Sequence, residues 1–299
     1  MKIAVTGRHG QVVRAIIERA PAGVIVMPLG RPEFDLADPA TIDAAIRAAA
    51  PDLVISAAAY TAVDRAQDDE AAAFAVNAAG AGAVAAAAAR IGVPVIHLST
   101  DYVFDGAKLS AYVETDPVAP LGAYGRSKLA GEAAVIAANP AAVIVRTAWV
   151  YSPFGHNFAK TMLRLARDRD ELTIVADQIG NPTSALDIAD GLLTMAPRLA
   201  KAGAGTPDLV GIFHMTGSGE ASWADFAQAI MNTSAAAGGP TARVRPIGTA
   251  DYPTPAPRPA NSRLDCTRLA RSYGIALPDW RDSTRTVVQR LITEQESLA

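Results

Sequence analysis

The stretch from Ser99 to Lys128, STDYVFDGAKLSAYVETDPVAPLGAYGRSK, carries the features that predict the fold. It follows an apolar run from Pro94 to Leu98, whose length and composition are typical of a buried parallel strand. The stretch therefore begins with two hydroxyl side chains, of which Thr100 is the second, at the carboxyl end of a strand. Open α/β sheets bind their ligands at that edge.

The same stretch ends with Tyr124 and Lys128, whose i, i+4 spacing places both side chains on one face of a helix. An ammonium beside a phenol favours the phenolate and would lower the tyrosine pKa from about 10. Such a tyrosine can exchange a proton with a carbonyl oxygen near neutral pH. A pair of this kind is also common on helix surfaces. This pair follows Thr100 by about the length of one loop, and that spacing favours a catalytic role for all three residues.

A glycine-rich turn opens the chain. Lys2 to Thr6 predicts a short strand, and a helical pattern follows the turn as far as about Ala20. This arrangement brings backbone N–H groups and a helix N-terminus to a pyrophosphate. The turn residues expected to bind it are Gly7, Gly10, Gln11 and Val12. Val13 occupies the place of a third glycine and predicts looser packing of the helix on the strand; an ordinary βα turn is the alternative.

The second predicted strand, Gly23 to Met27, bears on the choice of cofactor. No acidic residue follows it at once to bind an adenosine ribose, and Arg31 stands there instead. An arginine in this place can meet a 2′-phosphate, which favours NADPH over NADH. The alternative for Arg31 is a solvated loop arginine. Asp35 and Leu36 lie at the distance expected for contact with adenine.

Strands and helices alternate through the first half, which predicts a doubly wound parallel α/β sheet of the Rossmann type. The third strand, Asp52 to Ser56, leads to Ala59, Tyr60 and Thr61, which we expect to contact the cofactor. A long helix should follow from about Asp69 to Arg90. Within it, Asn77 is either buried and hydrogen-bonded to its neighbours or exposed. A fifth strand is expected from Ala142 to Arg146.

The second half predicts a smaller carboxy-terminal lobe. Its expected elements include a strand from Glu171 to Val175, a helix from Ala185 to Leu199 and a strand from Gly211 to Met215. A proline-fixed loop runs from Tyr252 to Pro259, and a helix from Asp282 to Glu296 closes the chain. We therefore expect residues 1–150 to form mainly a dinucleotide-binding domain. Residues 151–299 should form mainly a substrate-binding lobe, with some segments returning to the first domain.

Composition excludes several classes of protein. The 299 residues carry a net charge of −3 and no basic block, which argues against nucleic-acid binding. Cys266 is the only cysteine, and the four histidines lack ligand spacing, so neither a disulfide within the chain nor a metal site is expected. No secretory n-region precedes the first strand and no apolar run of membrane-spanning length is evident. We expect a cytoplasmic protein that does not enter membranes.

A set of motifs in one order resembles the dTDP-4-dehydrorhamnose reductases, a family of extended short-chain dehydrogenases/reductases. The motifs span nearly the whole chain, and extended reductases of other families share only the first few. They are SAAAYTAVD (56–64), STDYVFDG (99–106), YGRSKLAGE (124–132), RTAWVY (146–151), NFAKTMLRLA (157–166), DQIGNPT (177–183) and YPTPAPRPANSRL (252–264).

The resemblance implies reduction of the 4-keto group of dTDP-4-dehydro-6-deoxy-L-mannose to dTDP-L-rhamnose, a sugar nucleotide for cell-surface polysaccharides. The cofactor would be NADPH, with NADH possible. Tyr124 would protonate the 4-oxygen. Lys128 would hold the nicotinamide ribose and keep the phenol acidic, and Thr100 would orient the carbonyl. Some relatives use magnesium at a dimer contact, but Ala15 stands where a carboxylate would be needed, so the resemblance does not support magnesium here. A monomer or a homodimer is expected.

The resemblance also implies a substrate site. Asp101, Tyr102 and Trp149 would surround the sugar ring, although Trp149 also fits a core position. The proline–arginine motif would bind the nucleotide diphosphate through Arg258, Asn261 and Arg263.

Two other classes share this fold and cofactor site. A regulatory subunit of methionine adenosyltransferase would act as a binding partner, but it would not need Thr100, Tyr124 and Lys128. A nucleotide-sugar 4-epimerase would use those three residues while keeping NAD⁺ tightly bound.

Overall fold

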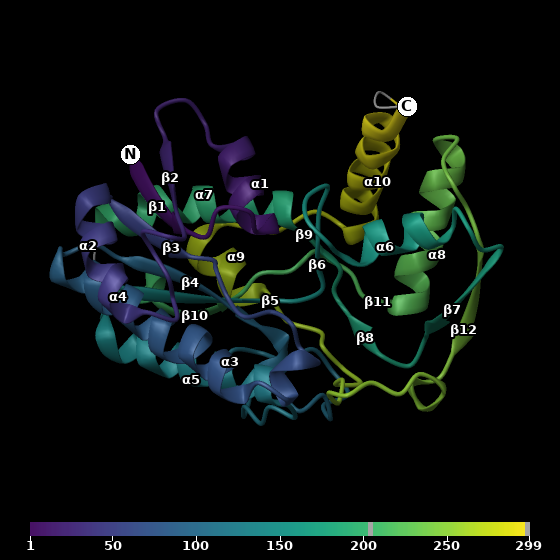
Figure 1. Ribbon diagram of the computed structural model, residues 1–299, viewed down its shortest axis with the longest axis horizontal. Coiled ribbons are helices and arrows are strands. Elements are labelled where there is room, and N and C mark those ends of the chain that lie inside the picture. Colours follow the sequence, from purple (N-terminus) through teal and green to yellow (C-terminus); the bar gives the residue numbers. More distant parts are fainter. Residues whose placement is uncertain (203–205, 297–299) are drawn as a thin grey trace.

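Six parallel strands lie side by side at the centre of the computed structural model, which describes residues 1–202 and 206–296. Their order across the sheet is β10-β5-β4-β3-β1-β2, so the chain winds outward in both directions from β1 and β3 (Figure 1). The strands are β1 (Lys2–Thr6), β2 (Ile25–Leu29), β3 (Leu53–Ser56), β4 (Val95–Thr100), β5 (Ala142–Thr147) and β10 (Gly211–His214). This is the doubly wound sheet that the alternating pattern predicts.

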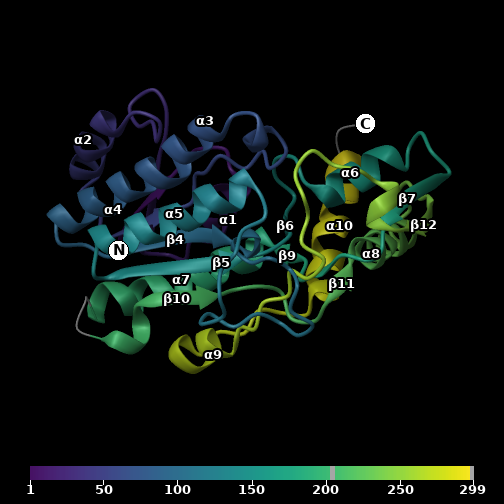
Figure 2. The ribbon, with the colours of Figure 1, turned by 90° about the horizontal axis from the view of Figure 1, so that it is seen from below.

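Helices cover both faces of this sheet, which is why its central strands are apolar throughout. Alternate side chains of a strand enter different cores: Ile3 and Val5 of β1 join one, and Ala4 joins the other. One face is covered by α1 (Gln11–Arg19) and α7 (Ala185–Ala202), and the opposite face by α2 (Pro39–Ala49), α4 (Ala81–Arg90) and α5 (Ala123–Ala138). Figure 2 shows α4 and α5 on one side of β4 and β5, with α7 on the other.

The long helix predicted after the third strand forms, but its middle turn is wider. It consists of α3 (Glu70–Phe74), a π-helical segment (Ala75–Gly80) and α4. Asn77 in the π-helical segment is buried, and its amide bonds the backbone N–H and carbonyl of Tyr60 and the hydroxyl of Ser127. The buried alternative for Asn77 is therefore confirmed. Its partners lie in the segment after β3 and on α5.

The helix from Glu70 to Arg90 corrects one expectation about membranes. By length and composition it is apolar enough to span a bilayer, because alanine dominates it. In the structure this helix is a core helix: Val84, Ala85 and Ala88 are buried between α4 and the sheet. A buried core helix and a membrane span can share the same composition, so hydropathy alone does not separate them.

Helix α5 packs on the sheet through polar side chains. Glu132 on α5 bonds Arg146 on β5 through two contacts of 2.9 and 2.6 Å, and the Ser99 hydroxyl donates to Glu132 at 2.5 Å. The side chains of this ion pair are only 2–3% exposed. The helix also approaches closely at Gly131, where a Cβ would clash with the carbonyl oxygen of Asn77. Charge pairing replaces an apolar stripe on this face of the helix.

A smaller lobe lies beside the carboxyl ends of the sheet strands, to the right in Figure 1. Its helices are α6 (Phe158–Leu165), α8 (Trp223–Ala236) and α10 (Trp280–Glu296). Three short two-stranded sheets accompany them: β7 (Glu171–Val175) with β12 (Arg243–Ile247), β8 (Ile179–Gly180) with β11 (Ala221–Ser222), and β6 (Val150–Tyr151) with β9 (Thr183–Ser184). After β12 the proline-rich segment returns to α9 (Thr267–Tyr273), which lies against β10.

The structure moves or adds a few elements relative to the sequence expectation. The second strand runs from Ile25 to Leu29, two residues later than predicted, because a turn at Gly23 with φ +87° precedes it. Strand β12 and helix α9 were not predicted. Strand β12 contains Pro246 and exposed arginines, which belong at a sheet edge and give no alternating signal. The division at residue 150 stays a prediction, and its second part includes residues 203–205 and 297–299, which lie outside the described residues.

The Glu132–Arg146 pair yields a stability prediction. Glu132→Ala should lower the free energy of unfolding by about 3–5 kcal/mol, since it leaves a buried guanidinium without its counter-charge. The double variant Glu132→Leu with Arg146→Met should recover much of this loss, because two apolar side chains need no partner. Urea denaturation followed by circular dichroism measures both. A single variant as stable as the wild type would contradict the assigned pair.

Candidate active site

Two cavities along the carboxyl ends of the strands form one groove. Each has a volume of about 370 Å³, and both are lined by Gly7, Ala58 and Ala59, where they meet. One cavity lies over the end of β2 and the other extends to Tyr124 and Lys128. A dinucleotide has two nucleoside ends joined by a pyrophosphate, so this shape matches one half in each cavity.

The glycine turn lies at the junction of the two cavities. Gly7 has φ +98°, and its N–H donates to the Leu29 carbonyl at 2.6 Å. A Cβ on Gly7 would lie only 3.3 Å from Val13 and 3.4 Å from Ala58, so a side chain there would fill the groove. Val13 is 1% exposed, so its side chain is packed in the core, and the looser packing of the helix on the strand stays a prediction. The first N–H groups of α1, from Gln11 onward, have no helical acceptor of their own.

The adenosine end of the groove contains the predicted Arg31, Asp35 and Leu36. The Arg31 side chain is 78% exposed, and its Nε lies 3.2 Å from an Asp35 carboxylate oxygen. Sequence reasoning missed Arg8, which lines the same cavity and pairs with Glu33 at 2.8 Å. Arginine side chains from two loops therefore face the place where the adenosine ribose would lie.

Three residues after the third strand were predicted to contact the cofactor, and two of them line the groove. Ala59 lines both cavities, and Thr61 lines the one that reaches Tyr124. Tyr60 packs instead against a small cluster of alanines, Ala66 among them, and its backbone is held by the amide of Asn77. Tyr60 lines neither cavity of the groove, so any contact with the cofactor stays a prediction.

Thr100 and Tyr124 meet at the end of β4. The Thr100 hydroxyl donates to Oδ1 of Asp101 at 2.8 Å. Burial raises the pKa of Tyr124 to about 12, and the Asp101 carboxylate adds to this, while a hydrogen bond with Thr100 opposes it. The expectation of a lowered tyrosine pKa is therefore wrong, because desolvation of the phenolate outweighs other effects. Tyr124 is a protonated phenol at neutral pH.

The partners of Lys128 explain why its ammonium does not lower the pKa of the Tyr124 phenol. Its ammonium donates to the Leu98 carbonyl at 2.6 Å and lies 3.1 Å from Nε2 of His97. Burial lowers the pKa of Lys128 to about 8, opposed by the charge of Glu132. Lys128 nevertheless lines the same cavity as Tyr124. The two residues share a site without a direct effect of the ammonium on the tyrosine pKa.

Asp101 and Tyr102, predicted to surround the sugar, follow directly on Thr100. Burial raises the pKa of Asp101 to about 6, and the nearby hydroxyls of Thr100 and Ser262 oppose the rise. Its Oδ2 is buried and finds no partner among the described residues. The Tyr102 ring meets the Tyr124 ring edge to face at 5.6 Å. Asp101 thus has one carboxylate oxygen still able to accept a hydrogen bond near the phenol.

Trp149 has a different environment from the one predicted. Its ring is stacked on Trp223, with centroids 3.6 Å apart and planes 7° apart, and a Cβ on Gly180 would meet ring atoms at 2.5 Å. Its backbone has φ +48°, a strained value for a tryptophan. Trp223 covers one face of the ring, and the Trp149 side chain is partly exposed, so its contact with the sugar stays a prediction. No local pattern in the sequence indicates that these two residues pair.

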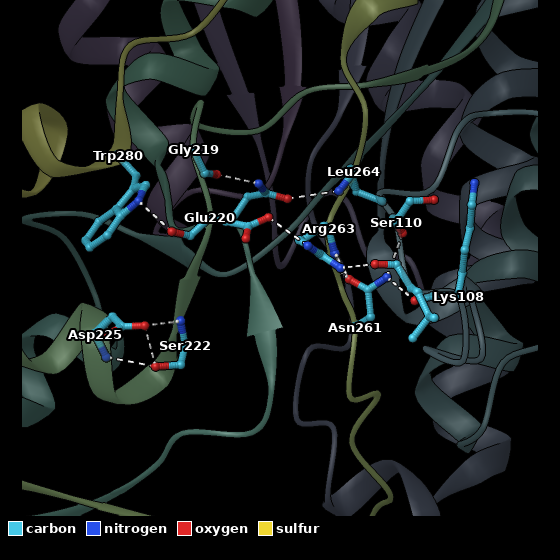
Figure 3. A network of polar contacts seen from close by, with 12 residues as sticks. Lys108, Ser110, Gly219, Glu220, Ser222, Asp225, Asn261, Arg263, Leu264 and Trp280 are labelled. Carbon is cyan, nitrogen blue, oxygen red and sulfur yellow. Dashed lines mark hydrogen bonds and ion pairs between the residues drawn. The ribbon is translucent and has the colours of Figure 1, made fainter.

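Asn261 and Arg263 belong to a network that ties three loops together (Figure 3). The Asn261 amide donates to the carbonyls of Lys108 and Ser110 at 2.6 and 2.8 Å, and its oxygen accepts from Arg263. Arg263 also bonds Glu220 at 2.8 Å. These bonds hold the two side chains in the network, and their predicted role at a diphosphate stays a prediction.

Arg258, the third residue of that prediction, joins the proline-rich segment to the first domain. Its guanidinium bonds both carboxylate oxygens of Asp64 at 2.8 Å, and the arginine side chain is 18% exposed. Its charge reaches the site, where it partly offsets the effect of burial on the pKa of Tyr102. Binding of the diphosphate by Arg258 stays a prediction.

The groove fits a nicotinamide dinucleotide on two observations. A Cβ would fill it at Gly7, and the Thr147 hydroxyl, which lines the cavity beside Tyr124, is buried without a partner among the described residues. Sequence reasoning missed Thr147, although it follows the fifth strand as Thr100 follows the fourth. Metal binding has no such support: the described residues contain no group of three or more His, Cys, Asp or Glu that could hold an ion.

Comparisons with known proteins agree with this geometry. The family model described as RmlD substrate binding domain matches residues 1–293. A dTDP-4-dehydrorhamnose reductase of Sinorhizobium fredii is 54% identical and covers 98% of this chain and 99% of its own. The crystal structure of such a reductase from Clostridium acetobutylicum has a TM-score of 0.90 at 37% identity, over 97% of this chain and 99% of that one.

A second crystal structure is a dTDP-4-dehydrorhamnose reductase from Bacillus anthracis in complex with NADP. It has a TM-score of 0.87 at 31% identity and covers 96% of this chain and 98% of that one. The likeness therefore extends over the sheet, the groove and the smaller lobe together. On the family model and on relatives that match end to end, the chain belongs to the dTDP-4-dehydrorhamnose reductases.

Proposed function

We propose that this protein reduces the 4-keto group of dTDP-4-dehydro-6-deoxy-L-mannose to give dTDP-L-rhamnose, with NADPH as the preferred reductant. The observation that carries the proposal is the groove that reaches from the glycine turn to Tyr124, in a chain of this reductase family. A binding partner of another enzyme would need the groove but not a buried phenol at its end.

NADPH, when bound, supplies the hydride that adds to the sugar C4. The residues of the chain handle the oxygen on that carbon. The Thr100 hydroxyl, which donates to Asp101 in this structure, would turn its one proton to the carbonyl oxygen and orient it, and Tyr124 would donate its proton to that oxygen as negative charge develops. A phenol with a pKa of about 12 is fully protonated near neutral pH, and an alkoxide is the stronger base. A raised tyrosine pKa is thus compatible with an acid that acts on reduction.

The cofactor site is proposed from the groove lining. N–H groups at Gly10, Gln11 and Val12 would bind the pyrophosphate, since a helix N-terminus favours anions. Lys128 and Thr147 would contact the nicotinamide ribose and carboxamide. Asp101 would accept a sugar hydroxyl through its unpartnered oxygen. The expected cytoplasmic location, and action as a monomer or homodimer, remain predictions.

Tyr124→Phe tests the acid. It removes only the hydroxyl, so NADPH affinity should stay within about twofold while kcat falls by at least ~10²-fold, the usual scale for a positioned general acid. Consumption of NADPH followed at 340 nm, with the dTDP-4-keto-sugar as substrate, gives kcat. Turnover near the wild-type value would rule out Tyr124 as the proton donor.

Arg31→Ala tests cofactor choice. The wild type should prefer NADPH. In the variant, the KM for NADPH should rise by up to about fivefold while the KM for NADH is unchanged. This size is expected for the loss of one exposed ion pair, worth up to about 1 kcal/mol. Arg47→Ala is the matched control, because Arg47 also forms an exposed i, i+4 pair but lines neither cavity. An unchanged ratio of the two KM values would make Arg31 a solvated loop residue.

Arg258→Ala tests the diphosphate contact, with titrations of dTDP and NADPH compared. The binding free energy should weaken by ~1–3 kcal/mol for dTDP and stay unchanged for NADPH, because one charged hydrogen-bonding partner of the diphosphate is removed. Asp64→Ala is the matched variant, since it breaks the same ion pair but leaves the guanidinium for the ligand. Equal loss in both variants would mean that the ion pair holds the proline-rich segment in place and that Arg258 does not bind the diphosphate.

A further inference from the structure

The ammonium of Lys128 has a partner on the sheet that the mechanism above does not use. His97, in the middle of β4, places Nε2 at 3.1 Å from Nζ of Lys128. On the far side of its ring, Nδ1 lies 3.0 Å from the hydroxyl of Ser56 on β3. All three side chains are no more than 2% exposed. They form a chain of hydrogen bonds from the third strand, through the fourth, to the catalytic helix.

The register of the strands and the helix explains why these groups meet. Ser56 and His97 are direct neighbours across the β3–β4 ladder. His97 and Ser99 lie on the same face of β4, two residues apart, and meet Lys128 and Glu132, one turn apart on α5. Residues two apart on the strand therefore face residues four apart on the helix across this interface.

Hydrogen-bond chemistry fixes the state of the ring. An ammonium only donates, so Nε2 of His97 must be the acceptor and carries no proton. A neutral imidazole then has its proton on Nδ1, which donates to the Ser56 hydroxyl. A protonated ring would direct an N–H at the ammonium. Burial lowers the pKa of His97 well below its ordinary value, and the charge of Lys128 adds to this effect.

We propose that His97, backed by Ser56, is a positioning residue that holds the Lys128 ammonium for catalysis through the neutral Nδ1–H tautomer. With one ammonium proton on the Leu98 carbonyl and one on His97, the third is directed at the cavity that Lys128 lines. The inference rests on the proposed function, since binding of the nicotinamide ribose is what gives this ammonium its task.

Loss of His97 would change the protonation of Lys128. The titratable and charged groups facing it are Glu132 and Tyr124 on α5, His97 on β4 and, beyond the phenol, Asp101. Burial already lowers the pKa of this ammonium to about 8. Without the acceptor on His97 the charged form loses a hydrogen bond, so the lysine pKa should fall further. Activity that needs the charged form should then be lost at a lower pH.

The first experiment needs no substrate. Two-dimensional ¹⁵N NMR of histidine-labelled protein, with His97 assigned by its loss in His97→Gln, reports the ring state between pH 6 and pH 9. The proposal requires a neutral ring with a protonated Nδ1 wherever Lys128 is charged, and Ser56→Ala should move the Nδ1–H resonance by removing its acceptor while Nε2 stays unprotonated. A wild-type ring protonated on Nε2, or charged, would overturn the proposal.

The second experiment compares pH profiles of kcat/KM. His97→Leu removes the acceptor, and its alkaline limb should move toward acid by about one to two pH units, as expected for the loss of one hydrogen bond to a charged group. His97→Gln, whose amide oxygen can reach the place of Nε2, should restore most of the profile. His214→Leu is the matched control: this buried strand histidine bonds the Tyr112 carbonyl and lies outside the groove lining.

The outcomes separate the inference from the proposed function. An alkaline limb in His97→Leu at the wild-type position, or moved equally by His214→Leu, would overturn the role of His97. If His97→Leu does not fold, His97→Gln and the NMR spectra still decide. If the wild type does not turn over the dTDP-keto-sugar, the proposed function fails, while the ring state and the pH dependence of NADPH binding continue to test the inference.

Discussion

The buried polar contact between α5 and the sheet is the constraint on which the site depends. Glu132 neutralises Arg146 where neither charge reaches water, and the Ser99 hydroxyl donates a further hydrogen bond to Glu132. Burying such charges is costly unless geometry and hydrogen bonding are nearly complete, so the helix has little freedom to rotate or slide. Tyr124 and Lys128 lie on the same helix, and their positions follow from that restriction. An apolar stripe of similar area would hold the helix with less angular precision.

The cofactor end of the site depends on close approach of backbone rather than on charge. Gly7 adopts a left-handed conformation, and Ala58 and Val13 lie where a side chain on it would point. Small residues therefore bring β1, β3 and α1 together around a narrow passage. The two ends of the groove are therefore built differently. At the catalytic end a buried ion pair positions the side chains, and at the glycine turn the lack of a side chain leaves backbone N–H groups accessible.

The sequence predicted the topology well because parallel strands and covering helices have strong, repeated patterns. Strand-end and helix spacing also pointed to Tyr124 and Lys128, which line one cavity, and to Thr100, whose catalytic role stays a prediction. The sequence expectation was wrong about the tyrosine pKa, because spacing along a helix does not tell how deeply a phenol is buried or whether Lys128 has a better partner. That partner, His97, lies in an apolar run that reads as an ordinary strand. The Trp149–Trp223 stack and the ties of Asn261 and Arg263 join segments far apart in the chain, which no local pattern reveals.

The return of β10 and α7 to the first domain has a consequence for biosynthesis. The sheet gains its sixth strand, and α1 its neighbouring helix, only from residues that follow the first elements of the smaller lobe. One continuous core also joins Val13 near the start of the chain to Phe226 and Trp280 near its end. While the ribosome has released only the first five strands, β5 is an open edge, and the part of one face that α7 later covers is exposed. The nascent chain must therefore avoid aggregation with this surface exposed until α7 and β10 have been made.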